Sequence, residues 1–302
     1  MPKMLDEGIK KILESRKFFS TFVVVKVATI GFFDGVHLGH RHLIGEVRGL
    51  AKNHKEESVV ITFSEHPLQV ICPQKMPKLL TTYEEKLTLL KEIGVDEVCT
   101  LPFTQELAQL SAKEFMQKVL KDRLRVGTLV LGYNHSFGNK NQGHDYEAYG
   151  KELGIEVVRA SALEGVSSSV IRNWLSEGNV AAANEALGYR YFLEGKVVHG
   201  RQVGRKIGFP TANIEVDKPK LLPMVGAYGV RAMVDNQVVE GMMNVGKESI
   251  EVHLLDFEGN LYGKMLRVEL ECFLRKEKTF ATLEELRLQL EADKRQILSR
   301  EF

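Results

Sequence analysis

The chain has 302 residues, of which 44% are hydrophobic and 27% are charged, and its formal net charge at pH 7 is +1. This length and composition predict a soluble protein with room for two domains, each with its own core. The near-zero net charge gives no general electrostatic reason to bind nucleic acid or a membrane surface. Neither kind of partner is therefore expected.

The cysteines and the ends of the chain indicate a cellular compartment. Cys72, Cys99 and Cys272 are far apart and form no C-x-x-C, which argues against a disulfide framework or a zinc ribbon and fits a reducing cytosol. Residues 1–20 lack the apolar core and small-residue cleavage site of a secretory signal. No apolar run is long enough to span a bilayer. These features predict a cytoplasmic protein.

The first predicted strand and helix flank a glycine-rich turn. Residues 22–30 form an apolar, β-branched run typical of a buried parallel strand, and residues 42–50 have apolar positions at helical spacing. The turn between them reads Gly-Phe-Phe-Asp-Gly-Val-His-Leu-Gly-His over residues 31–40, and we call it the histidine turn. Its glycines allow a ligand to approach the backbone, and the N–H groups that begin the helix favour anionic oxygens. We therefore expect a phosphate-binding turn.

His37 and His40 are three residues apart and can face the same anion. A zinc site would need further ligands at suitable spacing, and the nearby sequence offers no coherent set. An ordinary surface turn is the usual interpretation of an isolated H-x-x-H pair. Three glycines and Asp34 crowd around this pair, which favours a functional site.

The histidine turn resembles the HxGH signature of nucleotidyltransferases, in the form found in bacterial bifunctional riboflavin kinase/FAD synthetases. The resemblance extends over nearly the whole chain, because later stretches match further motifs of that family in order. It implies that His37 and His40 are catalytic in adenylyl transfer. It also implies nucleotide or phosphate contacts from Gly31, Phe33, Asp34, Gly35 and Gly39.

Strands and helices alternate through the rest of the N-terminal half. Further strands are predicted over residues 58–63, 97–101, 128–132 and 155–159. Thr82 with Glu85, and Ser111 with Glu114, have capping-box spacing at helix starts, and Gly94 can end the first of these helices. The pattern predicts an α/β, Rossmann-like domain: a mostly parallel sheet with helices on both faces and ligands beyond the carboxyl ends of its strands.

Two loops at predicted strand ends carry further candidates. His66 follows the second strand and could equally be a scaffold or a site residue, since loops host both. Residues 132–138 resemble the family's G-x-[DN]-x-x-F-G element, in which Asn134 stands where many relatives carry Asp. The resemblance implies that Asn134 contacts the nucleotide or its phosphates.

Residues 166–172 resemble the family's ISSxxIR motif at the start of a helix. Taken alone, three serines before a helix are usually only a cap. Together with the histidine turn, the motif implies phosphate contacts from Ser167 and Ser168. Arg172 adds a planar donor that can stabilise charge on a polyphosphate during transfer.

Near residue 188 the pattern changes to short strands with turn signals, which predicts domains of residues 1–186 and 187–302. Strands are expected over residues 195–199, 229–234, 237–243, 250–255 and 265–272, with tight turns at residues 235–236 and 258–260. This predicts an antiparallel β-barrel. A helix over residues 283–298 should close it, covering one face or end with Leu286, Leu288 and Leu290.

Residues 200–213 combine glycines and cations with a Pro-Thr-Ala-Asn tail, which suggests a loop around phosphates rather than a solvated basic run. The stretch resembles the riboflavin kinase signature GxxxGFPTAN. The resemblance implies that Thr211 and Asn213 offer oxygen atoms to Mg²⁺, a hard ion that prefers such ligands. It also implies nucleotide or phosphate contacts from Gly204, Lys206, Gly208 and Pro210.

Glu251 lies in a predicted strand downstream of this signature. A carboxylate held on a rigid strand can accept a hydroxyl proton during in-line phosphoryl transfer, although an isolated strand Glu is more often simply exposed. The resemblance favours catalysis, and it suggests a flavin contact for Arg275. One departure is a short connection between Gly246 and Glu251, where relatives usually carry a longer loop with an Arg-Pro-Thr element.

The resemblance as a whole implies a two-step synthesis from small-molecule substrates. ATP would phosphorylate riboflavin to FMN, and a second ATP would transfer AMP to FMN, giving FAD and pyrophosphate, with Mg²⁺ assisting both steps. Two alternatives remain open: an adenylyltransferase with a degenerate kinase domain, and a non-catalytic flavin-binding regulator. The sequence carries no signal for an oligomeric state.

Overall fold

The computed structural model describes residues 25–132, 137–138, 145–161, 163–200, 203–235 and 237–299, the side chain of Val203 excepted. The N-terminal half is built on a 5-stranded parallel sheet with strand order β3-β2-β1-β4-β5. Its strands are β1 (Lys26–Ile30), β2 (Glu57–Phe63), β3 (Glu97–Leu101), β4 (Val126–Leu131) and β5 (Glu156–Arg159). Each overlaps a predicted strand, so the predicted Rossmann-like arrangement is confirmed.

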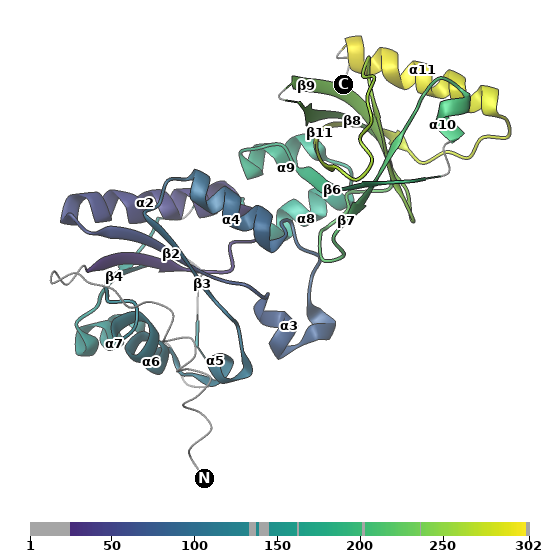
Figure 1. Cartoon of the computed structure of the whole chain (residues 1–302). Helices are drawn as coiled ribbons and strands as arrows, with labels where there is room; N and C mark the ends of the chain where they lie inside the picture. Colours follow the sequence, from purple (N-terminus) through teal and green to yellow (C-terminus); the bar gives the residue numbers. More distant parts are fainter. Residues whose placement is uncertain are drawn as a thin grey trace.

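Helices cover both faces of this sheet (Figure 1). One face carries α2 (Leu38–His54) and α4 (Tyr83–Glu92), and the other carries α5 (Gln105–Gln109), α6 (Ala112–Phe115), the π-helical η3 (Met116–Lys121) and α7 (Tyr146–Leu153). Successive side chains of β1 point to opposite faces of the sheet. Val27 packs in the apolar cluster between the sheet and α2, and Ala28 packs in the apolar cluster between the sheet and α7. The short elements η1 (Asp34–Val36), α3 (Pro67–Ile71) and η2 (Pro73–Lys75) lie in the connections.

The predicted helix signals are confirmed. The Thr82 hydroxyl accepts a hydrogen bond from the Glu85 amide at 3.2 Å, and the Glu85 carboxylate accepts one from the Thr82 amide at 2.8 Å. Ser111 and Glu114 make the same reciprocal pair. Gly94 follows α4 with φ of +82°, a conformation that glycine adopts without steric cost.

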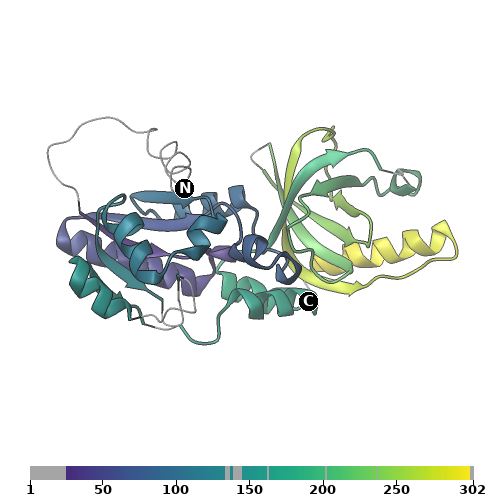
Figure 2. The same ribbon diagram turned by 90° about the horizontal axis from the view of Figure 1, so that it is seen from below.

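The C-terminal half is a closed antiparallel barrel (Figure 2). Its strand order is β10-β7-β6-β11-β8-β9. Its strands are β6 (Phe192–Val198), β7 (Ala212–Val216), β8 (Gly226–Val234), β9 (Gln237–Val245), β10 (Ile250–Leu254) and β11 (Met265–Lys276). The short helix α10 (Val203–Lys206) precedes β7, and α11 (Leu283–Ser299) lies against the barrel. The predicted barrel with a closing helix is confirmed.

Three details of the predicted barrel are wrong. The predicted loop of residues 200–213 runs into β7, a strand that was not predicted and that pairs with β6 and β10. Residues 258–260 do not close a hairpin, because β10 and β11 are not neighbours in the barrel. Leu288 is 52% exposed, because it lies two residues from both Leu286 and Leu290 and so points away from their face of the helix.

Two helices, α8 (Ser168–Ser176) and α9 (Val180–Leu187), connect the sheet to the barrel. Their buried side chains, including Leu175 and Ala183, belong to the same apolar cluster as Val230 and Leu270 of the barrel. A domain boundary at residues 186/187 stays a prediction. Among the described residues, no helix is both long and apolar enough to cross a membrane.

Candidate active sites

The histidine turn leaves the carboxyl end of β1 in a backbone conformation that few residues adopt. Phe33 has φ of +58° and Gly35 φ of +78°. A Cβ atom on Gly35 would come within 2.7 Å of the Leu80 side chain, and one on Gly39 would approach the His37 ring at 3.2 Å. Glycine therefore lets the turn fold tightly against the segment that precedes α4 and against its own histidine.

His37 and His40 lie together at the start of α2. Their rings stack with centroids 3.6 Å apart, and the His37 Nδ1 atom accepts a hydrogen bond from the His40 amide at 3.3 Å. Burial lowers the pKa of His37 from 6.5 to about 4, so the ring is neutral near pH 7. Because Nδ1 accepts, the proton of the neutral ring is assigned to Nε2, which leaves a neutral donor available for a ligand oxygen.

Acid should destabilise the protein partly through His37. Its pKa is lower in the folded chain than in the unfolded chain, so protonation favours unfolding. Its contribution to stability is fully present above the ordinary pKa of 6.5 and is lost as the pH falls through about 4, a change of up to about 3 kcal/mol. Between pH 6.5 and about 4, the free energy of unfolding measured in urea should fall more steeply for wild type than for His37→Gln. The control is His42→Gln at an exposed position, which should fall like wild type. An equally steep fall for wild type and His37→Gln would contradict the prediction.

Asp34 and Arg172 form a partly buried ion pair beside the histidines. The Arg172 guanidinium lies 3.0 Å from the Asp34 carboxylate, which also accepts hydrogen bonds from the amides of Leu80 at 2.9 Å and Thr81 at 3.2 Å. The Ser168 hydroxyl donates to the Asp34 carbonyl oxygen at 2.9 Å. The carboxylate of Asp34 is thus engaged with protein donors and orients Arg172.

The other residues predicted to contact the nucleotide or its phosphates near the histidine turn differ in their surroundings. Phe33 is buried with its ring edge against His40, and Gly31 packs against Phe33. Ser167 caps α8 by accepting a hydrogen bond from the Val170 amide. Asn134 lies outside the described residues.

The barrel site brings together Thr211, which directly precedes β7, Asn213 of β7 and Glu251 of β10. Glu251 of β10 is opposite Asn213 of β7 in the strand pairing, and the Thr211 hydroxyl donates to the Glu251 carboxylate at 3.3 Å. The His253 Nδ1 atom lies 2.7 Å from the carbonyl oxygen of Pro210 and ties the segment before Thr211 to β10. The site therefore depends on β7, the strand that the sequence did not predict.

Two cavities meet at Thr211. The first, of about 320 Å³, is lined by Arg205, Pro210, Thr211, Phe257 and Tyr262 among others. The second, of about 300 Å³, is lined by Thr211, Glu251, Asn244, Arg275 and Phe280 among others. A ligand in one cavity would therefore be next to a ligand in the other, with Thr211 at the junction and Glu251 on the side of the second cavity.

The glycines and cations predicted to bind phosphates in residues 204–208 differ in their surroundings. A Cβ atom on Gly204 would come within 2.1 Å of the Phe209 carbonyl oxygen, and Gly208 has φ of +84°, so both positions need glycine. Lys206 is exposed and lines neither cavity, whereas its neighbour Arg205 lines the first.

Residues 246–250 form a tight connection, in which the Gly246 amide donates to the Ser249 carbonyl oxygen at 2.9 Å. They line neither of these two cavities and border a different one, beside residues 214–222. The short connection thus lines a different cavity, although its Gly246 lies next to Asn244 and Glu277, whose side chains line the second cavity.

Comparison with known proteins assigns the chain to a family. The FAD synthetase family model matches residues 23–172, and the riboflavin kinase family model matches residues 187–300. A bifunctional riboflavin kinase/FMN adenylyltransferase of Listeria monocytogenes is 36% identical over 89% of this chain and 90% of its own length. The Escherichia coli protein of that name is 35% identical over 91% and 92%. The chain belongs to the bifunctional riboflavin kinase/FMN adenylyltransferase family.

A solved structure agrees with the fold. A chain described as a macrolide-efflux protein from Streptococcus pneumoniae is similar with a TM-score of 0.83 and 30% identity, over 91% of this chain and 94% of that one. We call residues 23–172 the adenylyltransferase region and residues 187–300 the kinase region. The histidine turn and Arg172 lie in the first, and Thr211, Asn213 and Glu251 in the second.

The adenylyltransferase region contains a buried cation that sequence reasoning missed. Lys86 of α4 donates to the Phe63 carbonyl oxygen at the end of β2, at 2.8 Å, and lies over the Phe32 ring at 3.7 Å. Burial lowers its pKa to about 8. Only its position just after a capping-box Glu could have drawn attention to it. His66 caps α3 by accepting a hydrogen bond from the Leu68 amide, which supports a scaffold role.

Arg275 of the kinase region is held by α11. Its guanidinium makes a bidentate contact with Asp293, with nitrogen to oxygen distances of 2.8 and 3.1 Å. Both side chains line the second cavity, and Asp293 is only 3% exposed. Arg275 thus fixes the closing helix to β11, whatever contact it makes with a ligand.

Replacing Asp293 with Asn should loosen α11. The change leaves the Arg275 charge partly buried without its carboxylate, and breaking such a pair costs about 3 kcal/mol. Thermal and urea unfolding should detect the loss. The matched control is Asp256→Asn, which removes an exposed ion pair between Asp256 and Lys294 of the same helix and should cost under about 1 kcal/mol. Equal effects of the two substitutions would contradict the assigned role.

Proposed function

We propose that the chain carries out both reactions of its family, making FMN from riboflavin and ATP in the kinase region and FAD from FMN and ATP in the adenylyltransferase region. The observation that carries the proposal is that each family-matched region holds a polar cluster suited to its reaction. These clusters are the stacked histidines beside Arg172, and Thr211 with Glu251 between two cavities.

In the kinase reaction, the first cavity takes the nucleotide and the second takes riboflavin. Arg205 and the segment 204–210, with its two glycines, suit polyphosphate oxygens. The second cavity places aromatic and apolar side chains beside Glu251. Glu251 accepts the proton of the ribityl hydroxyl as its oxygen bonds to the γ-phosphorus and the bond to ADP breaks. Thr211 holds the carboxylate in position.

The oxygen donors at this junction fit Mg²⁺. Asn213 and Glu251 come from adjacent strands, and the Thr211 hydroxyl just before β7 contacts the Glu251 carboxylate. Mg²⁺ is bound by few protein oxygens together with phosphates and water. The ion would neutralise charge on the phosphates when bound. Thr211 and Asn213 would hold it, which leaves Glu251 for the proton.

In the adenylyl transfer, the FMN phosphate oxygen attacks the α-phosphorus of ATP, and the bond to the departing pyrophosphate breaks. His37 and His40 face the anion from the start of α2, and neutral His37 donates a hydrogen bond without being an acid near pH 7. Arg172, oriented by Asp34, stabilises charge that develops on the phosphates. Catalysis is then positioning and charge stabilisation, with no covalent intermediate.

Separate incubations test the proposal. The protein with riboflavin, ATP and Mg²⁺ should give FMN, and with FMN, ATP and Mg²⁺ it should give FAD and pyrophosphate in equal amounts, as resolved by chromatography. Bound flavin without turnover in either mixture would contradict the proposal. The cytoplasmic location remains a proposal, supported by the absence of disulfides among Cys72, Cys99 and Cys272.

A further inference from the structure

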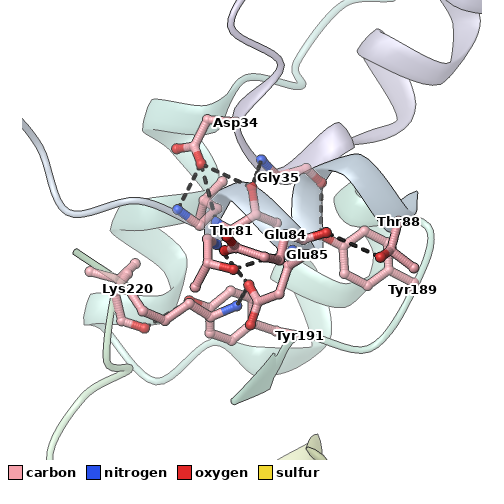
Figure 3. A network of polar contacts seen from close by, with 12 residues as sticks. Asp34, Gly35, Thr81, Glu84, Glu85, Thr88, Tyr189, Tyr191 and Lys220 are labelled. Carbon is pink, nitrogen blue, oxygen red and sulfur yellow. Dashed lines mark hydrogen bonds and ion pairs between the residues drawn. The ribbon is translucent and has the colours of Figure 1, made fainter. Parts of the chain in front are cut away.

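A buried ion pair joins the two regions. Lys220, on the connection between β7 and β8 of the kinase region, donates to the Glu85 carboxylate of α4 in the adenylyltransferase region at 2.5 Å (Figure 3). The Lys220 side chain is 0% exposed and that of Glu85 7%. The Lys220 ammonium also lies over the rings of Tyr191 and Phe192, at 4.9 and 4.4 Å from their centroids. The contact is thus desolvated and enclosed on several sides.

The backbone beside this pair is joined as well. The Leu79 amide donates to the Pro219 carbonyl oxygen, and the Leu221 amide donates to the Leu79 carbonyl oxygen, both at 2.7 Å. The Tyr191 hydroxyl donates to the Leu221 carbonyl oxygen at 2.7 Å. Residues 219–221 of the kinase region therefore hold the segment of residues 79–82 at its first residue and, through Glu85, at its last.

That segment positions the side chains of the histidine turn. Glu85 bonds the Thr82 amide, and the amides of Leu80 and Thr81 bond the Asp34 carboxylate, whose other oxygen pairs with Arg172. The Thr81 hydroxyl also accepts a hydrogen bond from the Gly35 amide at 3.1 Å. Polar contacts and the backbone of residues 80–82 thus connect Lys220 to Asp34 (Figure 3). Asp34 in turn pairs with Arg172.

The energetics favour a positioning role for the pair. A buried ion pair adds little net stability compared with well-packed apolar side chains of similar size, whereas it fixes the two charged groups in one arrangement. An apolar contact would join the regions equally well but would leave the charged Glu85 carboxylate of the capping box without its buried partner. The pair is therefore better explained by orientation of residues 79–82 than by attachment of the regions.

We propose that Lys220 of the kinase region is a positioning residue for adenylyl transfer, acting through Glu85 and residues 79–82 to hold Asp34 and Arg172. The inference rests on the proposed function of the histidine turn. It means that the kinase region completes the adenylyltransferase site. The kinase reaction does not need Lys220, because this residue lines neither of the cavities that meet at Thr211.

The test uses Lys220→Met in the full chain and measures both activities of each sample. The kcat of FAD formation from FMN should fall about 10- to 100-fold, and the KM for FMN should change less. The reason is that a displaced Arg172 weakens stabilisation of the transition state more than it weakens FMN binding. FMN formation from riboflavin should stay at the wild-type rate. Lys78→Met is the matched control, since Lys78 is an exposed lysine that bonds the Lys218 carbonyl oxygen at the same contact.

A double variant separates positioning from simple damage. Glu85→Gln with Lys220→Met removes both buried charges, and Gln can still accept the Thr82 amide at the same position of a capping box. Its FAD formation should recover to within a few-fold of wild type, whether or not the single variant folds. A kinase-active double variant that forms no FAD overturns the proposal. Wild-type FAD formation by Lys220→Met, or an equal loss of both activities, overturns it too.

The proposed function fails in a different way. If wild type makes no FAD from FMN, the adenylyltransferase assignment itself is wrong. If wild type makes FAD and Arg172→Ala does so equally well, the assigned site is wrong. The Lys220 variants test the inference when wild type forms FAD and Arg172→Ala does not.

Discussion

Glu251→Gln should stop the formation of FMN from riboflavin while FAD formation from supplied FMN continues. The substitution keeps the shape of the side chain and an oxygen that the Thr211 hydroxyl can reach, but it removes the proposed acceptor of the ribityl proton. We expect the kinase rate to fall about 10²- to 10⁴-fold, as is typical when a general base is lost. Riboflavin affinity, followed by flavin fluorescence, should change little.

The control for Glu251 is Glu215→Gln on neighbouring β7. Glu215 is an exposed strand carboxylate and lines neither cavity that meets at Thr211, so both reaction rates should match wild type. A Glu251→Gln variant that phosphorylates riboflavin at nearly the wild-type rate would show that Glu251 is not the base.

His40→Ala should have the opposite selectivity, ending FAD formation while FMN formation is kept. The substitution removes the ring stacked on His37 and, with it, one of the proposed donors to the transferred phosphate. Loss of a donor that stabilises transition-state charge costs about 10²- to 10³-fold. The barrel site should be unaffected, because its polar cluster lies on β7 and β10.

His42→Ala is the matched control for His40. His42 is on the same helix but bonds the Ser161 hydroxyl at the surface, at 2.7 Å. It should retain both activities. If His40→Ala reduced both activities equally, the division of labour between the regions would be wrong.

The N-terminal fold could be predicted because its signals are local. Apolar runs such as residues 58–63 form strands that are buried on both faces. Capping boxes mark helix starts with residues only three positions apart, such as Thr82 and Glu85. Strand β7 could not be predicted in this way. In Ala-Asn-Ile-Glu-Val, only Ile214 is fully buried, and the strand is defined by its pairing with β6 and β10.

The candidate sites were predictable only in part, because motifs name residues without giving their partners. Asp34 belongs to the histidine turn, yet its role depends on Leu80, Thr81 and Arg172, which are distant in sequence. The pairing of Lys220 with Glu85 has no local signature at all. A lysine in a turn is usually solvated, and only the packing of the two regions buries this one.

The central claim is that one chain phosphorylates riboflavin and then adenylylates the product, and labelled ATP tests it most directly. Riboflavin, Mg²⁺ and ATP labelled at either the γ- or the α-phosphate would be incubated with the protein, and the flavins resolved over time. The γ-label should appear first in FMN and then in FAD, and the α-label should appear only in FAD. An α-label in FMN, or γ-labelled FMN with no FAD in either mixture, would contradict the account.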